Sequence, residues 1–155
     1  MDDTALIRRA LEIARRAVIH GNHPFGALLT DEHGNVVLES ENTVETFRDP
    51  TGHAETNLVR AAGAKFSKAE LAGMSLYTST EPCAMCSGAI YWAGIGRVVY
   101  GLSEAGLLKL TGDNPSNETM HLPCREVLAR GQRTVEVIGP LIEEEAATVH
   151  EGFWN

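Results

Sequence analysis

The sequence predicts one α/β domain, residues 1–155, in which helices cover both faces of a five-stranded mixed sheet. Its length of 155 residues suits a single domain with one sizeable core. Two strand-like segments come early and are joined by a turn, and strand-like and helix-like segments alternate after them. Such alternation is typical of parallel strands joined by right-handed helical crossovers. We therefore expect a hairpin followed by parallel strands.

The first third of the chain predicts a helix and a hairpin. Residues 4–20 place their apolar side chains on one broad stripe, which is typical of an amphipathic helix, and Gly21 ends it. Residues 25–30 and 36–41 are two short strand candidates. The polar, glycine-containing segment 31–35 between them is a hairpin signal.

The rest of the chain predicts alternating elements. We expect helices over residues 53–64, 82–93, 123–130 and 141–154, and strands over residues 75–79, 97–101 and 134–138. Pro82 fits the first turn of its helix, where its missing N–H has no cost. The helix at 123–130 excludes a tight hairpin between strands four and five, so these strands are expected to be parallel. Residues 103–117 are rich in Gly, Asn and Ser and are expected to form a loop.

Composition and charge argue against a membrane or a polyanion as partner. The chain is 43% hydrophobic and 22% charged, as in an ordinary soluble globular protein. No apolar run approaches the roughly 20 residues needed to span a bilayer, and the acidic start of the chain does not resemble a signal peptide. The net charge of −8 argues against nucleic acid, because binding phosphates requires clustered Lys and Arg.

The chain has three cysteines and no export signal. We therefore expect reduced thiols in a cytoplasmic protein and not a disulfide framework. Cys83 and Cys86 form a C-x-x-C pair, whereas Cys124 is left over and is interpreted as structural.

Two short motifs together predict a zinc site. His53 and Glu55 form H-x-E, and Cys83 and Cys86 follow Pro82 in P-C-x-x-C. Residues three apart on a helix share a face, so both sulfurs reach one metal ion. Both cysteines fall in the first turn of their predicted helix, where the helix dipole favours thiolate. His53 begins another predicted helix, so two helix N-termini are expected to aim at one point.

This set of ligands predicts a catalytic site and not a structural one. Two thiolates and one imidazole leave the fourth tetrahedral position of zinc open for water. Zinc lowers the pKa of bound water to ~7 in favourable sites, so hydroxide becomes available as the nucleophile. Glu55 does not share a helix face with His53, and we expect it beside the metal as a proton shuttle. Each motif alone is common, but H-x-E with P-C-x-x-C is the signature of the zinc base deaminases. The remaining five histidines show no ligand spacing and receive no role.

These motifs resemble those of the cytidine deaminase superfamily. Residues 49–55 and 77–86 carry the resemblance, residues 88–93 extend it, and it covers nearly the whole chain. The resemblance implies a cytidine deaminase-like fold, a three-layer α/β/α sandwich around a five-stranded sheet, in agreement with the predicted order of elements. It also implies Zn2+ as cofactor and an oligomer, for which we expect a homodimer.

Bacterial guanine deaminases form one branch that shares the Pro-Phe-Gly-Ala and Ala-Ile-Tyr-Trp-Ala segments with this chain. By that resemblance, Phe25 packs against the base, Asn42 bonds to it, Trp92 walls the pocket and Asp113 contacts the substrate. Core packing for Phe25 and Trp92, and a turn for Asn42, are the alternative interpretations.

Two other branches also resemble the chain. The branch that acts on cytosine has an aromatic C-terminus closing the site, a role that Phe153 and Trp154 would take here. The tRNA adenosine deaminases share residues 96–101, but this chain lacks their basic loop after strand four and their basic tail.

These observations lead to the hypothesis of an enzyme that hydrolyses the exocyclic amine of a small free nucleobase or nucleoside and releases ammonia. The backbone at Ala54 and Cys83 would help to hold the tetrahedral intermediate. A guanine-like heterocycle is favoured over cytosine, and tRNA adenosine is the third candidate. A noncatalytic, zinc-stabilised nucleotide-binding module is the alternative from another class.

Overall fold

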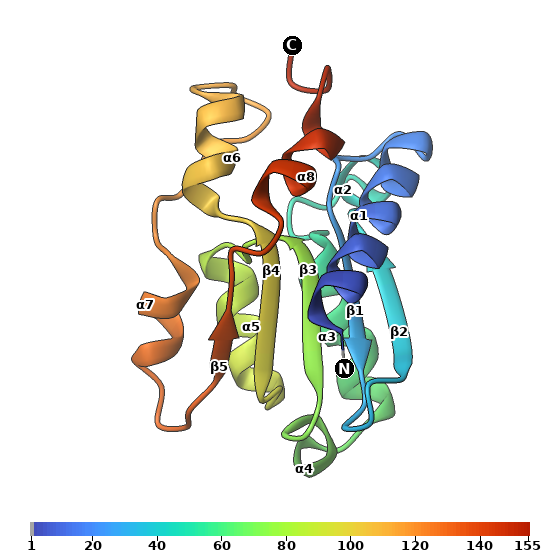
Figure 1. The fold of residues 1–155 in the computed structure, drawn as a ribbon, viewed down its shortest axis with the longest axis vertical. Helices are drawn as coiled ribbons and strands as arrows, with labels where there is room; N and C mark the ends of the chain where they lie inside the picture. Colours follow the sequence, from blue (N-terminus) through green and yellow to red (C-terminus); the bar gives the residue numbers. More distant parts are fainter. Residues whose placement is uncertain (1) are drawn as a thin grey trace.

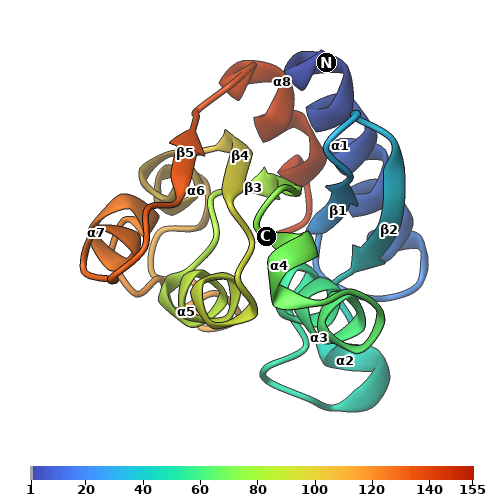
Figure 2. The ribbon, with the colours of Figure 1, turned by 90° about the horizontal axis from the view of Figure 1, so that it is seen from below.

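The computed structural model describes residues 2–155 and consists of a twisted sheet between two layers of helices (Figures 1 and 2). The strands are β1 (Gly26–Thr30), β2 (Val36–Glu41), β3 (Ser75–Thr80), β4 (Arg97–Leu102) and β5 (Glu136–Ile138). The helices are α1 (Asp3–Ile19), α2 (Val44–Phe47), α3 (Ala54–Lys65), α4 (Lys68–Leu71), α5 (Ala84–Ala93), α6 (Glu104–Thr111), α7 (Cys124–Ala129) and α8 (Glu143–Ala147), followed by the 3-10 turn η1 (Thr148–His150).

The sheet has the strand order β2-β1-β3-β4-β5. Strand β1 is antiparallel to both β2 and β3, whereas the pairs β3–β4 and β4–β5 are parallel. The predicted five-stranded mixed sheet is therefore confirmed, including the parallel pairing of strands four and five. The predicted hairpin is formed by β1 and β2, with the turn at residues 31–35 between them.

Two apolar cores lie on opposite faces of the sheet, because successive strand residues point to opposite sides. On one face, α1 and α8 cover Leu28 of β1 and Tyr77 of β3. On the other face, α3 and α5 cover Leu76 of β3 and Val98 of β4 (Figure 2). All four side chains are fully buried. This confirms the predicted α/β/α sandwich.

Helix α1 lies very close to the start of β1, and Gly26 makes this approach possible. A Cβ atom at Gly26 would lie 2.5 Å from the backbone nitrogen of Ala14 and 2.6 Å from the carbonyl oxygen of Ala10. Neither is a distance that a real Cβ tolerates, so any larger residue would push α1 away from the sheet. The close contact fixes the position of Phe25, which directly precedes the strand.

The prediction of a loop over residues 103–117 was wrong for its first half, which forms α6. The hydroxyl of Ser103 accepts a hydrogen bond from the N–H of Gly106 at 3.0 Å and caps the helix, and Leu107 is buried. The Gly- and Asn-rich residues that suggested a loop all lie after Thr111, apart from Gly106.

Other elements differ from the prediction in length or were not expected. The last helix was predicted to reach Trp154, but α8 ends at Ala147 and only the turn η1 follows. Helices α2 and α4 have four residues each, which is too short for a periodic apolar pattern to reveal them. None of the helices in the described part of the chain combines the length and apolar character that a membrane span requires.

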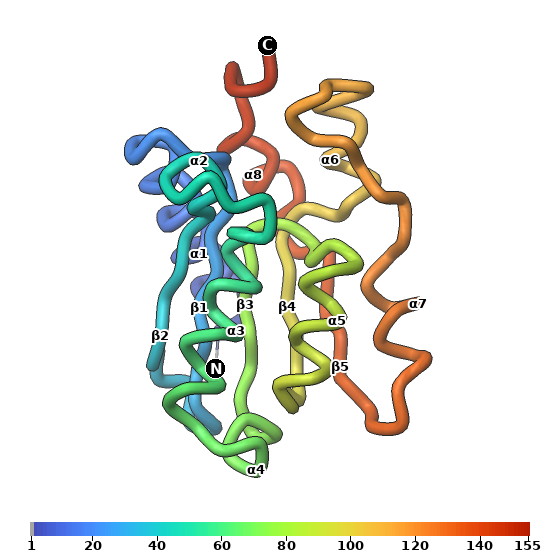
Figure 3. Tube along the Cα trace, turned by 180° about the vertical axis from the view of Figure 1, so that it is seen from behind, coloured from blue at the N-terminus to red at the C-terminus, as the bar shows by residue number. Residues whose placement is uncertain are grey.

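One end of the molecule gathers the segments that build the site. The carboxyl ends of β3 and β4 point to the end where α2, α6 and the C-terminus lie, opposite α4 (Figures 1 and 3). In open α/β sheets, ligands bind outside the carboxyl ends of parallel strands. We therefore expect the functional site at this end of the sheet.

Candidate active site

The N-termini of α3 and α5 carry the predicted metal ligands. His53 is the N-cap residue of α3 and Cys83 is the N-cap residue of α5, both with extended backbone. Cys86 follows one turn later inside α5 and is completely buried. Helices α3 and α5 pack side by side on the same face of the sheet (Figure 3). The expectation that two helix starts meet at one point is therefore met.

The three side chains form a group that fits a zinc ion. Nδ1 of His53 lies 3.5 Å from Sγ of Cys83 and 3.5 Å from Sγ of Cys86. All three candidate ligand atoms lie within 4.8 Å of one another. A nitrogen 2.1 Å and a sulfur 2.3 Å from a tetrahedral zinc ion are separated by about 3.6 Å. The arrangement matches this separation and leaves one tetrahedral position free of protein ligands from residues 2–155.

The electrostatics of the cysteine pair favour metal binding. A hydrogen bond from Cys86 and a second from His53 lower the pKa of Cys83 to about 4. The same contact raises the pKa of Cys86, because its proton is shared with the Cys83 sulfur. A divalent cation that takes the place of this proton would stabilise both thiolates at once. The hydroxyl of Thr56 lies 3.1 Å from Sγ of Cys86 and gives this sulfur a further polar neighbour.

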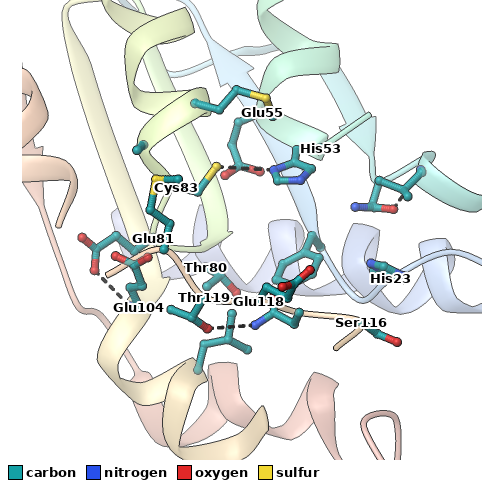
Figure 4. Close-up of a pocket in the computed structure, with 18 of the residues that line it drawn as sticks. His23, His53, Glu55, Thr80, Glu81, Cys83, Glu104, Ser116, Glu118 and Thr119 are labelled. Carbon is teal, nitrogen blue, oxygen red and sulfur yellow. Dashed lines mark hydrogen bonds between the residues drawn. The ribbon is translucent and has the colours of Figure 1, made fainter. Parts of the chain in front are cut away.

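Glu55 lies beside the triad but does not belong to it. It is only 6% exposed, and it lines the cavity together with His53 and Cys83 (Figure 4). Burial, followed by the negative charge of Cys83, raises the pKa of Glu55 to about 7. A carboxyl group with such a pKa exchanges protons readily at neutral pH, as the proposed proton shuttle requires.

The cavity in front of the triad has a volume of about 480 Å³. Small-molecule sites typically span ~300–1,000 Å³, so a single base fits inside. The walls come from residues on either side of the β1–β2 hairpin, from the starts of α3 and α5, from α6 and from residues 115–120. Helix α6 and the segment after it thus form part of the cavity.

Asn42 and Phe25 line the cavity, as the sequence led us to expect. Asn42 is 1% exposed, and its Oδ1 accepts a hydrogen bond from the N–H of Val44 at 3.1 Å. This bond fixes the orientation of the amide, and the Nδ2 group has no partner among residues 2–155. Asn42 therefore offers N–H donors to a molecule in the cavity.

Trp92 and Asp113 do not line the cavity of their own chain. Trp92 is 76% exposed and packs edge-on against Tyr91. It lies nine residues beyond Cys83, about 13 Å along the axis of α5, so it is too far from the start of that helix to wall the pocket. Asp113 is exposed and lies two residues beyond the end of α6. In the single chain neither residue reaches the cavity, and their substrate contacts stay predictions.

The C-terminal aromatic residues pack against residues of the cavity wall and not against the cavity itself. Phe153 and Trp154 are half-buried and do not line the cavity. Their rings pack against His23, with centroids 5.8 Å and 5.6 Å away, and Trp154 also lies 6.2 Å from Phe25. His23 and Phe25 do line the cavity. The C-terminus therefore contacts the cavity only through the packing of its rings against these two residues, and its own side chains do not close the cavity.

Ala54, the first residue of α3, is fully buried, and its side chain belongs to the core under α3. The role of the Ala54 and Cys83 backbone in holding an intermediate stays a prediction. Cys124 is buried too, and all three cysteines are free.

Among the titratable residues that line the cavity, four were missed by the sequence analysis: His23, Glu81, Glu104 and Glu118. Glu81 directly precedes Pro82, and its place next to the motif was a usable signal. His23 and Glu104 had no such signal, because they reach the cavity only through the packing of the hairpin and of α6.

Glu81 joins the ends of three elements. Its Oε1 accepts a hydrogen bond from the N–H of Glu104 at 2.9 Å, and its Oε2 accepts one from the N–H of Cys124 at 2.8 Å. These N–H groups belong to the first residues of α6 and α7. A carboxylate at a helix N-terminus is favoured by the exposed N–H groups and the helix dipole. Glu81 therefore anchors both helices to the end of β3.

Glu104 forms a second acidic group next to this anchor. It is 7% exposed, and its Oε2 is buried without a hydrogen-bond partner among residues 2–155. Burial, the charge of Glu81 and then that of Cys83 raise the pKa of Glu104 to about 7. The cavity therefore has one carboxyl group beside the metal triad and another on the wall formed by α6 (Figure 4).

The α/β/α sandwich and the His-Cys-Cys triad with its adjacent carboxyl group define a zinc-dependent deaminase. The chain belongs to the cytidine and deoxycytidylate deaminase family, whose zinc-binding region model matches residues 1–102. Its metal is therefore zinc, and His53, Cys83 and Cys86 form the group that could hold it.

The chain is similar to proteins from several branches of this family. A probable cytosine deaminase from Schizosaccharomyces pombe is 43% identical over 154 residues, which cover 99% of this chain and 93% of the relative. A tRNA-specific adenosine deaminase from Haemophilus influenzae is 38% identical over 102 residues, 66% of this chain and 59% of the relative. The solved structure of a guanine deaminase from Nitrosomonas europaea matches with a TM-score of 0.76 and 25% identity, covering 94% of this chain and 81% of that one.

Proposed function

We propose that this protein hydrolyses the exocyclic amine of a free nucleobase, with cytosine as the first candidate substrate. The observation that carries the proposal is the position of Glu55, a buried carboxyl group beside the triad at the wall of a cavity sized for one base. The sequence analysis favoured a guanine-like substrate. The similarity to a probable cytosine deaminase, which extends over nearly the whole of both chains, now favours cytosine.

The reaction replaces a carbon–nitrogen bond with a carbon–oxygen bond. Water adds to the amine-bearing ring carbon, and ammonia leaves, so a 4-amino group becomes a carbonyl group. A bound zinc ion would supply Lewis acidity and an activated water molecule at neutral pH. Glu55 takes the proton released by the attacking water, delivers a proton to the ring nitrogen, and later protonates the departing amine. One carboxyl group with a pKa of about 7 serves all three transfers.

Asn42, Phe25 and His23 orient the base. The free Nδ2 group of Asn42 donates to a carbonyl oxygen or ring nitrogen of the substrate. Phe25 offers an aromatic edge or face to the ring. Burial lowers the pKa of His23, so its imidazole is neutral at physiological pH and adds no charge to the cavity. These three residues support binding of a flat, uncharged heterocycle.

Guanine remains the second candidate, because the structural likeness to a guanine deaminase extends over 94% of the chain. The cavity volume of about 480 Å³ accommodates a pyrimidine or a purine. Adenosine in tRNA is the third candidate. The net charge of −8 and the carboxyl groups around the cavity disfavour an RNA backbone near the site. A noncatalytic module is disfavoured by the buried Glu55, which such a module has no use for.

Ammonia release measured on the zinc-loaded protein tests these candidates. The panel contains cytosine, guanine, cytidine, guanosine, adenosine and a tRNA anticodon stem-loop, with zinc content determined on the same sample. Turnover of cytosine above the other compounds is expected. Turnover of the stem-loop alone would move the assignment to tRNA. If no compound of the panel releases ammonia although zinc is bound, the proposal is overturned in favour of a binding module.

The homodimer implied by the family resemblance and the cytoplasmic location expected from the cysteines both stay predictions. Light scattering on the purified chain tests the first of them. The exposed side chains of Met85 and Trp92 on α5 form an apolar surface that a second copy would cover.

A further inference from the structure

Glu104 lies in the cavity with a carboxyl oxygen that the protein does not use. Its Oε2 is buried and has no hydrogen-bond partner among residues 2–155. The residue as a whole is 7% exposed and lines the same cavity as Glu55 and the triad. Buried polar atoms in folded proteins are almost always paired, and leaving one unpaired costs free energy. We therefore expect this oxygen to accept a hydrogen bond from a molecule that is not part of the chain.

The capping of α6 gives no reason to keep a glutamate at this position, although the carboxyl group also takes part in a hydrogen bond with the backbone of Leu122, which lowers its pKa. The N-terminus of α6 is already capped by the Ser103 hydroxyl, and the N–H of Glu104 is bound by Glu81. The N–H of Ser103 is bound by Oε2 of Glu143 at 2.8 Å. The Glu104 side chain adds nothing to this capping, and it places a second carboxyl group next to Glu81. Such an arrangement opposes stability, as is common for groups retained for binding.

We propose that Glu104 binds the substrate, with Oε2 accepting a hydrogen bond from an N–H group of the aminated heterocycle. The proposal rests on the proposed nucleobase deamination and extends it to the choice among bases. Asn42 supplies a donor to the cavity, and Glu104 supplies an acceptor. Figure 4 shows Glu104 on the side of Cys83 and Glu81, away from His23. The pair of groups selects a ring that presents both an acceptor and an N–H donor.

Two sources of the N–H group fit this contact, the ring nitrogen that carries the sugar in a nucleoside and the exocyclic amine. If the ring N–H is the donor, Glu104 distinguishes a free base from its nucleoside, because the glycosidic bond replaces that hydrogen. If the exocyclic amine is the donor, Glu104 holds the group that leaves as ammonia. In both cases the Glu104 carboxyl group is a determinant of substrate choice. Bases methylated at the sugar-bearing ring nitrogen distinguish the two cases, because they lack that ring N–H but keep the exocyclic amine.

The test compares Glu104→Leu, Glu104→Gln and a matched control with wild-type zinc-loaded protein. Glu104→Leu removes the acceptor, whereas Glu104→Gln keeps one carbonyl oxygen. The control is Glu12→Gln, which changes the same charge on an exposed residue of α1 outside the cavity. We expect KM for the preferred base to rise tenfold or more in Glu104→Leu, with an intermediate value in Glu104→Gln and no change in Glu12→Gln. The thermal unfolding temperature of Glu104→Gln is expected not to fall.

A binding measurement makes the result independent of turnover. Calorimetric titration of the base into Glu55→Gln and into the Glu55→Gln, Glu104→Leu double variant gives the affinity directly, and the double variant is expected to bind at least tenfold more weakly. A loss seen with cytosine and guanine but absent with 1-methylcytosine and 9-methylguanine identifies the ring N–H as the donor. An equal loss with the methylated bases identifies the exocyclic amine.

Two results would overturn the proposal and can be told apart. If wild-type protein turns over a base and Glu104→Leu keeps its KM and its affinity, the Glu104 contact alone is rejected. If the zinc-loaded wild-type protein neither turns over nor binds any base of the panel, the proposed function fails, and the contact fails with it.

Discussion

The indole N–H of Trp154 donates a hydrogen bond to Nδ1 of His150 at 3.0 Å, and the two rings stack at an angle of 21°. The other ring nitrogen, Nε2, faces the hydroxyl of Thr80 at 3.5 Å, at the end of β3. A nitrogen that accepts a hydrogen bond cannot carry a proton, so this imidazole is neutral in the folded protein. His150 is 3% exposed, and burial lowers its pKa to about 4. The C-terminal segment that supports Phe25 and His23 therefore depends on an uncharged histidine.

Acidification is expected to destabilise the protein through His150. The unfolded chain binds a proton at this residue below its ordinary pKa of 6.5, whereas the folded chain does so only near pH 4. This contribution to stability is complete above pH 6.5 and is lost as the pH falls from 6.5 to 4. The difference corresponds to about 3 kcal/mol at 1.36 kcal/mol per pH unit. Urea unfolding at pH 7.5 and pH 5 measures the part lost between pH 6.5 and pH 5, about 2 kcal/mol.

A His150→Gln variant provides the control for this pH dependence. Glutamine does not titrate, so the fall in stability between pH 7.5 and pH 5 is expected to be smaller than in the wild-type protein. An identical fall in both proteins would show that other groups cause the acid sensitivity.

Glu55→Gln is expected to lower turnover by a factor of about 10² or more and to leave zinc content unchanged. Glutamine has nearly the same shape but cannot transfer a proton, and general acid–base catalysis contributes about 10²–10⁴-fold. Ammonia release and metal analysis on the same sample measure both quantities. Activity near that of the wild-type protein would reject Glu55 as the proton shuttle.

Cys83→Ala is expected to reduce zinc content from about one ion per chain to near none, because it removes one of three protein ligands. Cys124→Ala is the control, since Cys124 is a buried cysteine that lies outside the triad. Metal analysis after dialysis against a weak chelator distinguishes them. Equal zinc content in the two variants would exclude Cys83 as a ligand.

Glu81→Gln is expected to lower the free energy of unfolding by about 1–3 kcal/mol. The amide group of glutamine can accept only one of the two backbone hydrogen bonds from Glu104 and Cys124, so one buried N–H loses its partner. Thermal unfolding is expected to shift down by about 2–4 °C per kcal/mol. Glu12→Gln, an exposed change of the same kind, serves as control, and the same shift in both variants would contradict the anchoring role.

Much of the fold follows from local sequence signals. The apolar stripe of α1, the hairpin turn at residues 31–35 and the alternation of later elements predict the sheet and its helical layers, because periodicity is a property of short windows. The loop predicted over residues 103–117 was wrong because the Gly and Asn residues at its end outweighed the shorter apolar pattern around Leu107. Helices of four residues leave no such pattern.

The sequence by itself determined which residues form the His-Cys-Cys group and which carboxyl group lies beside it. Histidine and cysteine are specific zinc ligands, and their places at helix starts follow from spacing along a few residues. Only the tertiary structure decided which other residues line the cavity, beyond Phe25 and Asn42. It brings Glu104 and His23 to the cavity, and it leaves Trp92 exposed on α5. The physical reason is that a cavity wall consists of contacts between residues far apart in the chain, such as Glu81 and Cys124, whose meeting depends on how whole helices pack on the sheet.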